Sequence, residues 1–208
     1  QDNDTKGKNM NNENLEVYPL FAKTVIRTTV DLEGTDISKI EWVPNYHDNI
    51  STSQTVIDDD NFKKLKEECM KGIHDYFYDV MHVDPVTEIY ITESWFNKTE
   101  TNQTHHRHWH PNSVLSAIVF LSGDAEQGGH TSFITGAYDT LEFEITEPNL
   151  WNSKSWSVEP TVGTMLIFPS SMEHLVQSYT GTTPRITLSF NTFVKGQING
   201  QTLTRLNV

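Results

Sequence analysis

From Pro85 onward the chain is a succession of short β-rich segments separated by glycine and proline, and this pattern restricts the fold more than any other feature. Val, Ile, Thr and aromatic residues are enriched in these segments, as they are in strands. About nine short strands with turn residues between them are typical of a jelly-roll sandwich. The predicted strands are residues 88–96, 103–110, 114–121, 130–134, 140–145, 155–158, 164–168, 174–178 and 185–194.

The part of the chain before Pro85 contributes one strand and one helix. Residues 16–30 are rich in β-branched side chains and predict a strand, whereas residues 31–57 predict irregular structure. Residues 58–81 predict an α-helix, because apolar side chains recur every three or four positions and three aspartates begin the segment. The sequence therefore predicts a mainly β jelly roll with one supporting α-helix near residues 58–81, packed on the outside of one sheet.

The chain has 208 residues, which suits one domain with a core of its own. Residues 1–14 are polar and predict a disordered leader or an expression remnant, with Met10 as a candidate natural start. We expect residues 15–208 to form a single domain. Cys69 is the one cysteine, so an internal disulfide is excluded, and its place in the helical pattern predicts a small core residue.

Net charge and hydropathy exclude two classes of partner. The formal charge of −13 leaves no basic footprint for nucleic acid. No run of 18 apolar residues is present, so we expect no membrane span. Without a secretory signal at its start, the sequence predicts a cytoplasmic protein.

Four of the nine histidines lie within six positions, at His105, His106, His108 and His110. Side chains alternate along a strand, so His108 and His110 should share one face, about 7 Å apart, with His106 at its rim and His105 on the other face. Two such imidazoles can bind one metal ion. The best candidate for a third ligand is His174, which follows the buried-looking strand at residues 164–168 and could return across the sandwich. Packing or surface histidines are the alternative.

The segment that begins at Arg185 has one polar and one apolar face. Arg185, Thr187, Ser189 and Asn191 share one side by period-two alternation. An inward polar face indicates a pocket, and a buried arginine there needs an anion. A carboxylate matches the planar guanidinium fork. A structural salt bridge to one of the 28 acidic residues is the alternative.

These motifs, in this order, resemble the Fe(II)/2-oxoglutarate-dependent oxygenases, and most closely the small prolyl-hydroxylase-like group found in bacteria and tailed phages. The resemblance covers roughly residues 17–195. It rests on the runs YPLF at 18–21, HWHPNS at 108–113, LSAIVFL at 115–121, GG at 128–129, GTMLIFP at 163–169, His174, and RITLSFN at 185–191. The resemblance implies a double-stranded β-helix fold, Fe(II) as the metal and 2-oxoglutarate as co-substrate.

By this similarity His108 and His174 match the first and the distal iron ligand, and His110 takes the position usually held by Asp or Glu. Arg185 matches the basic residue that pairs with the far carboxylate of 2-oxoglutarate, with Thr187 and Ser189 beside it. Asn97 falls where family members often place a polar pocket residue. The metal-ligand set is then His108, His110 and His174, and the co-substrate set is Asn97, Thr187, Ser189 and Arg185.

The sequence departs from the family at two positions. The family's H-x-D/E reads H-x-H here, which removes one negative charge from the metal site. Iron could then be held by two of these histidines, or His130 could join. The tyrosine often found in the strand after the motif is Phe120, so one hydroxyl contact to 2-oxoglutarate is missing.

The resemblance implies a hydroxylase that uses O2, releases succinate and CO2, and acts on a peptidyl residue such as proline, with a small molecule as the other substrate class. The alternatives are a three-histidine cupin-like dioxygenase without 2-oxoglutarate and a non-catalytic jelly-roll binding module. Residues 45–54 and 146–155 are candidate lids. Aromatic side chains that could wall the pocket are Trp95, Trp109, Trp151 and Trp156.

Overall fold

The computed structural model describes residues 18, 20–136, 141, 143–199 and 204–208. The leader predicted at residues 1–14 lies outside the described residues and stays a prediction.

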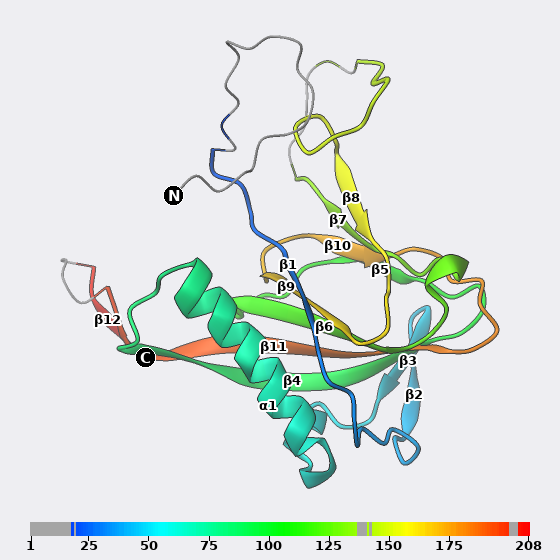
Figure 1. Ribbon diagram of the computed structural model, residues 1–208, viewed down its shortest axis with the longest axis horizontal. Helices are drawn as coiled ribbons and strands as arrows, with labels where there is room; N and C mark the ends of the chain where they lie inside the picture. Colours follow the sequence, from blue (N-terminus) through cyan, green and yellow to red (C-terminus); the bar gives the residue numbers. More distant parts are fainter. Residues whose placement is uncertain (1–17, 19, 137–140, 142, 200–203) are drawn as a thin grey trace.

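Two antiparallel sheets form the body of the protein (Figure 1). The larger has the order β1-β9-β6-β11-β4-β3-β2, with β12 paired to β11, and the smaller has the order β5-β10-β7-β8. The predicted jelly-roll class is confirmed. The large sheet comprises β1 Ile26–Thr29, β2 Trp42–Asn45, β3 Asp48–Ser51, β4 Thr87–Thr99, β6 Leu115–Ser122, β9 Thr164–Pro169, β11 Arg185–Ile198 and β12 Leu206–Asn207. The small sheet comprises β5 His105–His108, β7 Thr131–Ile134, β8 Ser155–Val158 and β10 His174–Val176, and η4 Ala125–Gln127 precedes β7.

The large sheet is covered on both faces, which explains its continuous apolar strands. On β6, Ala117 and Val119 belong to the core beneath the helix, whereas Ile118 and Phe120 belong to the core between the sheets. The second core is small, because much of the space between the sheets is lined by polar side chains instead. Alternation along the strands thus gives the large sheet two different faces. One packs against the helix, and the other, called the site side, faces the small sheet and the polar pocket.

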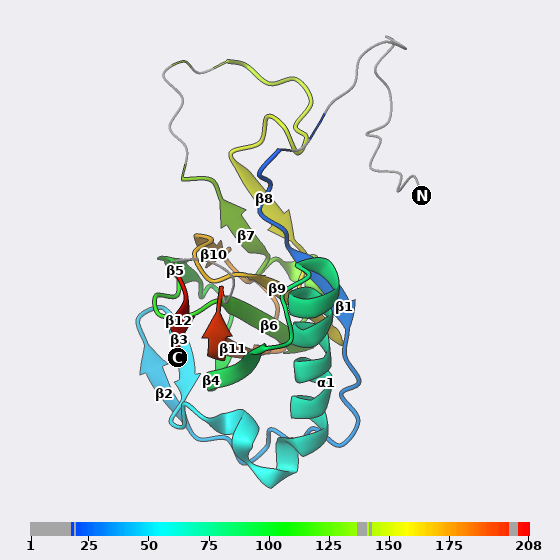
Figure 2. The same ribbon diagram turned by 90° about the vertical axis from the view of Figure 1, so that its left-hand side faces the viewer.

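The helix lies across the outer face of the large sheet, as predicted, and contacts β4 and β9 (Figures 1 and 2). The α-helix itself is shorter than predicted: α1 is Lys63–His74, preceded by the 3-10 turns η1 Val56–Asp58 and η2 Asp60–Phe62 and followed by the π-helical η3 Asp75–Val80. Asp59 does not cap α1, because its carboxylate accepts from the Asn61 amide in η2. Gly72 allows α1 to lie close to β9, because a Cβ at this position would lie 2.4 Å from Met165 Cε.

Two strand predictions and one prediction of irregular structure are wrong in part. Of residues 16–30 only Ile26–Thr29 forms a strand among those described, because only these four residues pair, with β9. Residues 141 and 143–145 are described and form no strand. Residues 31–57 are not wholly irregular, since β2 and β3 pair within them and join the sheet through β4. No helix in the described part of the chain is long and apolar enough to cross a membrane.

The long β4–β11 pair sets the position of the polar row that faces the small sheet. Its register pairs Thr187 with Asn97 and Ser189 with Trp95, so two strands contribute matched side chains to one face. The short strands β5 and β10 pair with each other in the facing sheet. The histidine segments therefore lie opposite the Arg185 strand.

Candidate metal and co-substrate site

Three imidazoles, two from residues 108–110 and one from the distant His174, meet between the sheets. His108 ends β5, His174 begins β10, and the two are cross-strand partners. Their ring centroids lie 4.3 Å apart, and the His110 ring lies 5.0 Å from His108 and 5.2 Å from His174. One nitrogen from each of the three lies within 4.8 Å of the others. The structure therefore brings together the three residues that the sequence nominated.

Two of the rings are oriented for coordination by backbone carbonyls. His108 Nδ1 lies 2.8 Å from the His106 carbonyl oxygen, and His174 Nδ1 lies 3.0 Å from the Met172 carbonyl oxygen. Because a carbonyl oxygen only accepts, each Nδ1 carries the proton and each Nε2 keeps its lone pair. This is the usual arrangement of metal-binding histidines.

Burial keeps all three imidazoles neutral near pH 7. Desolvation lowers the pKa of His108 to about 4 and that of His110 to about 4. Desolvation, followed by the nearby His108, lowers the pKa of His174 to about 3. A cation entering the site therefore competes with few protons at neutral pH.

The environment of His110 differs from that of the other two. The Asn191 amide nitrogen donates to Glu93 Oε1 at 2.6 Å, and the Asn191 amide oxygen accepts from Ser116 Oγ at 2.6 Å. The same amide nitrogen lies 3.4 Å from His110 Nδ1. Since the amide orientation is fixed by its other partners, Nδ1 of His110 faces a donor and acts as an acceptor. If His110 binds a cation through Nε2, its proton must lie on Nδ1. The Asn191 amide must then rotate so that its oxygen, instead of its nitrogen, faces Nδ1.

This difference predicts two tautomers within one cluster of the metal-free protein. Long-range ¹H–¹⁵N NMR at neutral pH should show protonated Nδ1 for His108 and His174, and protonated Nε2 for His110. In Asn191→Leu, which lacks the amide donor, His110 should lose this preference. Finding the Nδ1-protonated tautomer on all three rings of the wild-type chain would contradict the assignment.

Arg185 lies deeper in the same pocket and has unpaired nitrogens. It is 2% exposed, and neither Nε nor Nη2 has a hydrogen-bond partner among the described residues. Burial lowers the pKa of Arg185 to about 10, so it is still charged at neutral pH. The Phe120 ring, at the position where the family often has tyrosine, lies 5.3 Å from the guanidinium carbon. For these two nitrogens the alternative of a structural salt bridge is not realised, and the guanidinium is free to bind an anion.

The remaining predicted residues line this pocket between Arg185 and the imidazoles. Thr187, Ser189 and Asn97 all contribute to its wall. The Asn97 amide nitrogen donates to Ser189 Oγ at 2.9 Å, while its buried amide oxygen has no partner in the described chain. A bound molecule with both an anionic group and a donor would satisfy these orphaned atoms.

Sequence reasoning missed two ionisable pocket residues, Asp48 and His105. Asp48 lies on β3, in a segment predicted to be irregular, and His105 was assigned to the opposite face of its strand. No sequence signal identifies them, because the burial of Asp48 and its contact with His105 are tertiary features. Of the candidate lids, residues 45–54 contribute Asp48, whereas residues 146–155 do not line this pocket.

Most of the tryptophans proposed as pocket walls, and His130, lie outside this pocket. Of the four candidate tryptophans only Trp95 lines the pocket, with its ring 5.8 Å from that of His110. Trp109, Trp151 and Trp156 are 55%, 49% and 48% exposed, and Trp156 lines a separate pocket beside β8. His130 belongs to neither histidine cluster among the described residues.

Comparisons with known proteins agree with this geometry. Residues 93–191, which span the pocket strands from Glu93 to Asn191, match the model of a family of 2OG-Fe(II) oxygenases. No curated protein sequence matches the chain.

Two examples represent the solved structures that share the fold. HygX from Streptomyces hygroscopicus, with nickel, 2-oxoglutarate and hygromycin B bound, has a TM-score of 0.54 at 9% identity, over 82% of this chain and 82% of that chain. The non-haem, alpha-ketoglutarate-dependent epimerase SnoN from nogalamycin biosynthesis has a TM-score of 0.53 at 13% identity, over 78% of this chain and 72% of that chain.

The residues present suit Fe(II) and a keto diacid. Neutral imidazoles are good ligands for Fe(II), and three of them converge here. The unpaired nitrogens of Arg185 are good partners for a carboxylate. Both features lie in one pocket, the imidazoles and the guanidinium forming parts of the same wall.

Proposed function

On the premise that this chain is a 2-oxoglutarate-dependent, non-haem Fe(II) oxygenase, as the match over residues 93–191 indicates, we propose that it hydroxylates a C–H bond of a peptidyl residue such as proline. The observation that supports 2-oxoglutarate as the co-substrate is the buried Arg185 guanidinium, with Nε and Nη2 unpaired, in the same pocket as three convergent imidazoles. A plain metal site would need no such cation.

In this proposal His108, His110 and His174 hold Fe(II), and Arg185 holds the far carboxylate of 2-oxoglutarate. Bound Fe(II), together with O2 and 2-oxoglutarate, would supply the oxidising power for hydroxylation, with succinate and CO2 as the products of 2-oxoglutarate. The guanidinium forms a charge-assisted fork with that carboxylate. Because Arg185 is buried on a long paired strand, it fixes the position of the co-substrate rather than following it.

Polar residues beside Arg185 form the rest of the proposed co-substrate site. Thr187 and Ser189 follow Arg185 on β11 and line the same pocket, and the Asn97 amide nitrogen donates to Ser189 Oγ at 2.9 Å. Ile118 and Val176 form an apolar part of the wall, which limits the access of water to the reacting groups. In this proposal the far carboxylate supplies the hydrogen-bond partner that Arg185 Nε and Nη2 lack in the described chain.

The substrate class rests on the resemblance to the prolyl-hydroxylase-like group and on the exposed side chains near the histidine strand. Tyr46 is 88% exposed and Trp109 is 55% exposed, and such aromatic side chains suit the rings and backbone of a peptide. Small molecules form the second class to test, because the HygX structure contains hygromycin B.

The test is succinate formation by the Fe(II)-loaded protein with 2-oxoglutarate, O2 and a panel of proline-containing peptides and small molecules. We expect succinate to form together with a product that gains one oxygen atom. Oxidation of a substrate at the same rate without 2-oxoglutarate would instead favour the three-histidine, cupin-like dioxygenase. If a small molecule is hydroxylated and no peptide of the panel is modified, the peptidyl substrate is refuted, whereas the 2-oxoglutarate-dependent reaction is not.

A further inference from the structure

A second cluster of histidines overlaps the first at one residue. His105, His106 and His108 each offer a nitrogen within 4.8 Å of the others. The ring centroids of His105 and His106 lie 4.8 Å apart, and those of His105 and His108 lie 4.7 Å apart. Neither His105 nor His106 belongs to the metal-ligand set described above, although His105 lines the same pocket.

The cluster exists because β5 is irregular. Strand alternation predicted that His105 and His106 would point to opposite faces. Instead their rings are stacked at 19°, and the pairing of β5 with β10 shifts register between His174 and Val176. A register shift breaks the two-residue alternation, so neighbouring side chains can share one side.

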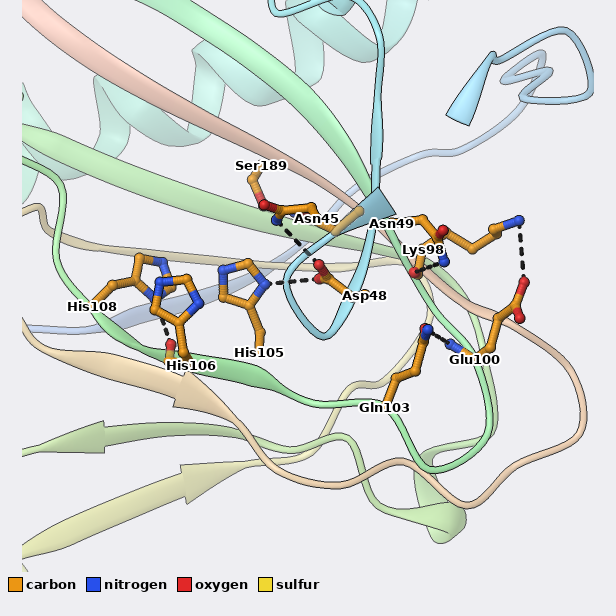
Figure 3. A network of polar contacts seen from close by, with 11 residues as sticks. Asn45, Asp48, Asn49, Lys98, Glu100, Gln103, His105, His106, His108 and Ser189 are labelled. Atoms are coloured by element: carbon orange, nitrogen blue, oxygen red, sulfur yellow. Dashed lines mark hydrogen bonds and ion pairs between the residues drawn. The ribbon is translucent and has the colours of Figure 1, made fainter. Parts of the chain in front are cut away.

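A buried acid orients the first of these histidines. The Asp48 carboxylate lies 2.8 Å from His105 Nδ1, and the two side chains are 2% and 15% exposed (Figure 3). The Asn45 amide nitrogen donates to the other Asp48 oxygen at 3.1 Å. A carboxylate only accepts, so Nδ1 of His105 carries the proton and Nε2 keeps its lone pair. A carboxylate behind a histidine is the usual second layer of a metal site.

We propose that His105, His106 and His108 form a second cation site, with Asp48 as its positioning residue, and that this site takes Zn²⁺ in preference to Fe²⁺. Imidazoles suit Zn²⁺, which binds more tightly than Fe²⁺ to a given set of nitrogen ligands. Zn–N bonds of about 2.0–2.1 Å require the three nitrogens to lie closer together than the 4.8 Å limit within which they stand. His106 is exposed and can make that movement.

The two sites compete for His108. Its Nδ1 lies 2.8 Å from the His106 carbonyl oxygen, so only Nε2 is free to bind a cation. One nitrogen lone pair cannot bind two ions, and Zn²⁺ in the second site therefore withdraws His108 from the first. The two cations exclude each other, and zinc acts as an antagonist of iron loading. The second site does not depend on the reaction proposed for the first.

The test uses a chain in which the first site is broken. His110→Gln/His174→Gln retains the second cluster, and we expect it to bind one Zn²⁺ per chain in calorimetric titration with zinc chloride. Adding Asp48→Asn should weaken this binding by about 10- to 100-fold, the usual effect of removing a second-layer partner. Adding His105→Gln should weaken it further.

Equal Zn²⁺ affinity in the parent double variant and in its His105→Gln derivative overturns the proposal, since binding would then be adventitious. If the double variant fails to fold, the single variant His110→Gln serves as the background, because His110 is less buried than His174. NMR of that variant should show Zn²⁺ shifting the ring signals of His105 and His106. Unshifted signals at saturating Zn²⁺ also overturn it.

Discussion

Arg185→Met is expected to weaken 2-oxoglutarate binding by about 30-fold or more while Fe(II) binding is retained. Truncating one partner of a buried, hydrogen-bonded charge pair costs about 2–5 kcal/mol, and about 1.4 kcal/mol corresponds to tenfold in affinity. Methionine approximates the apolar stem of arginine, and it removes a buried charge whose Nε and Nη2 have no partner in the described chain. Folding should therefore be unharmed, as thermal unfolding of the metal-free protein can verify.

Two further variants make the Arg185 result specific. Arg185→Lys keeps the charge but loses the two-pronged fork, so its affinity should fall between those of the wild type and Arg185→Met. Arg27→Met removes an exposed arginine of β1 that donates to Thr161 Oγ1 at 2.7 Å, and should leave 2-oxoglutarate binding unchanged. Wild-type affinity in Arg185→Met would remove Arg185 from the co-substrate site.

His174→Gln is expected to lower Fe(II) affinity by more than about 100-fold. Loss of a second-layer partner alone typically costs 10- to 100-fold, and a direct ligand should cost more. His174 is 2% exposed and its ring is the nearest neighbour of His108, at 4.3 Å between centroids. Equilibrium dialysis against Fe(II) under anaerobic conditions measures the effect.

His130→Gln is the matched control for His174→Gln. His130 immediately precedes β7, which pairs with β10, but it lies outside both histidine clusters of the described residues. Its replacement should leave Fe(II) affinity unchanged. If His130→Gln loses iron as severely as His174→Gln, His130 takes part in the site and the ligand set is wrong.

Period-two alternation predicted the site side of the molecule well where strands are long and regular. On β11, Leu188 and Phe190 pack beneath the helix, while Arg185 and Ser189 face the pocket. Twelve residue pairs with β4 hold this strand in a register with one irregularity, between Asn191 and Thr192. The inward face of such a strand can be read directly from the sequence.

Alternation failed where strands are short or irregular. β5 has four residues and its pairing with β10 shifts register, so His105 could not be placed from sequence position. Asp48 was missed because the β2–β3 hairpin carries Pro44 and Asn45, which are typical of turns rather than strands. The second histidine cluster depends on both features and required the tertiary structure.

The most direct test of the account is anaerobic titration of the Fe(II)-loaded protein with 2-oxoglutarate, followed by visible absorption. The account predicts a charge-transfer band that saturates at one 2-oxoglutarate per chain, with Arg185→Met needing a concentration about 30-fold higher or more. A protein that retains Fe(II) but shows no band at saturating 2-oxoglutarate would contradict the claim that metal and co-substrate share this pocket.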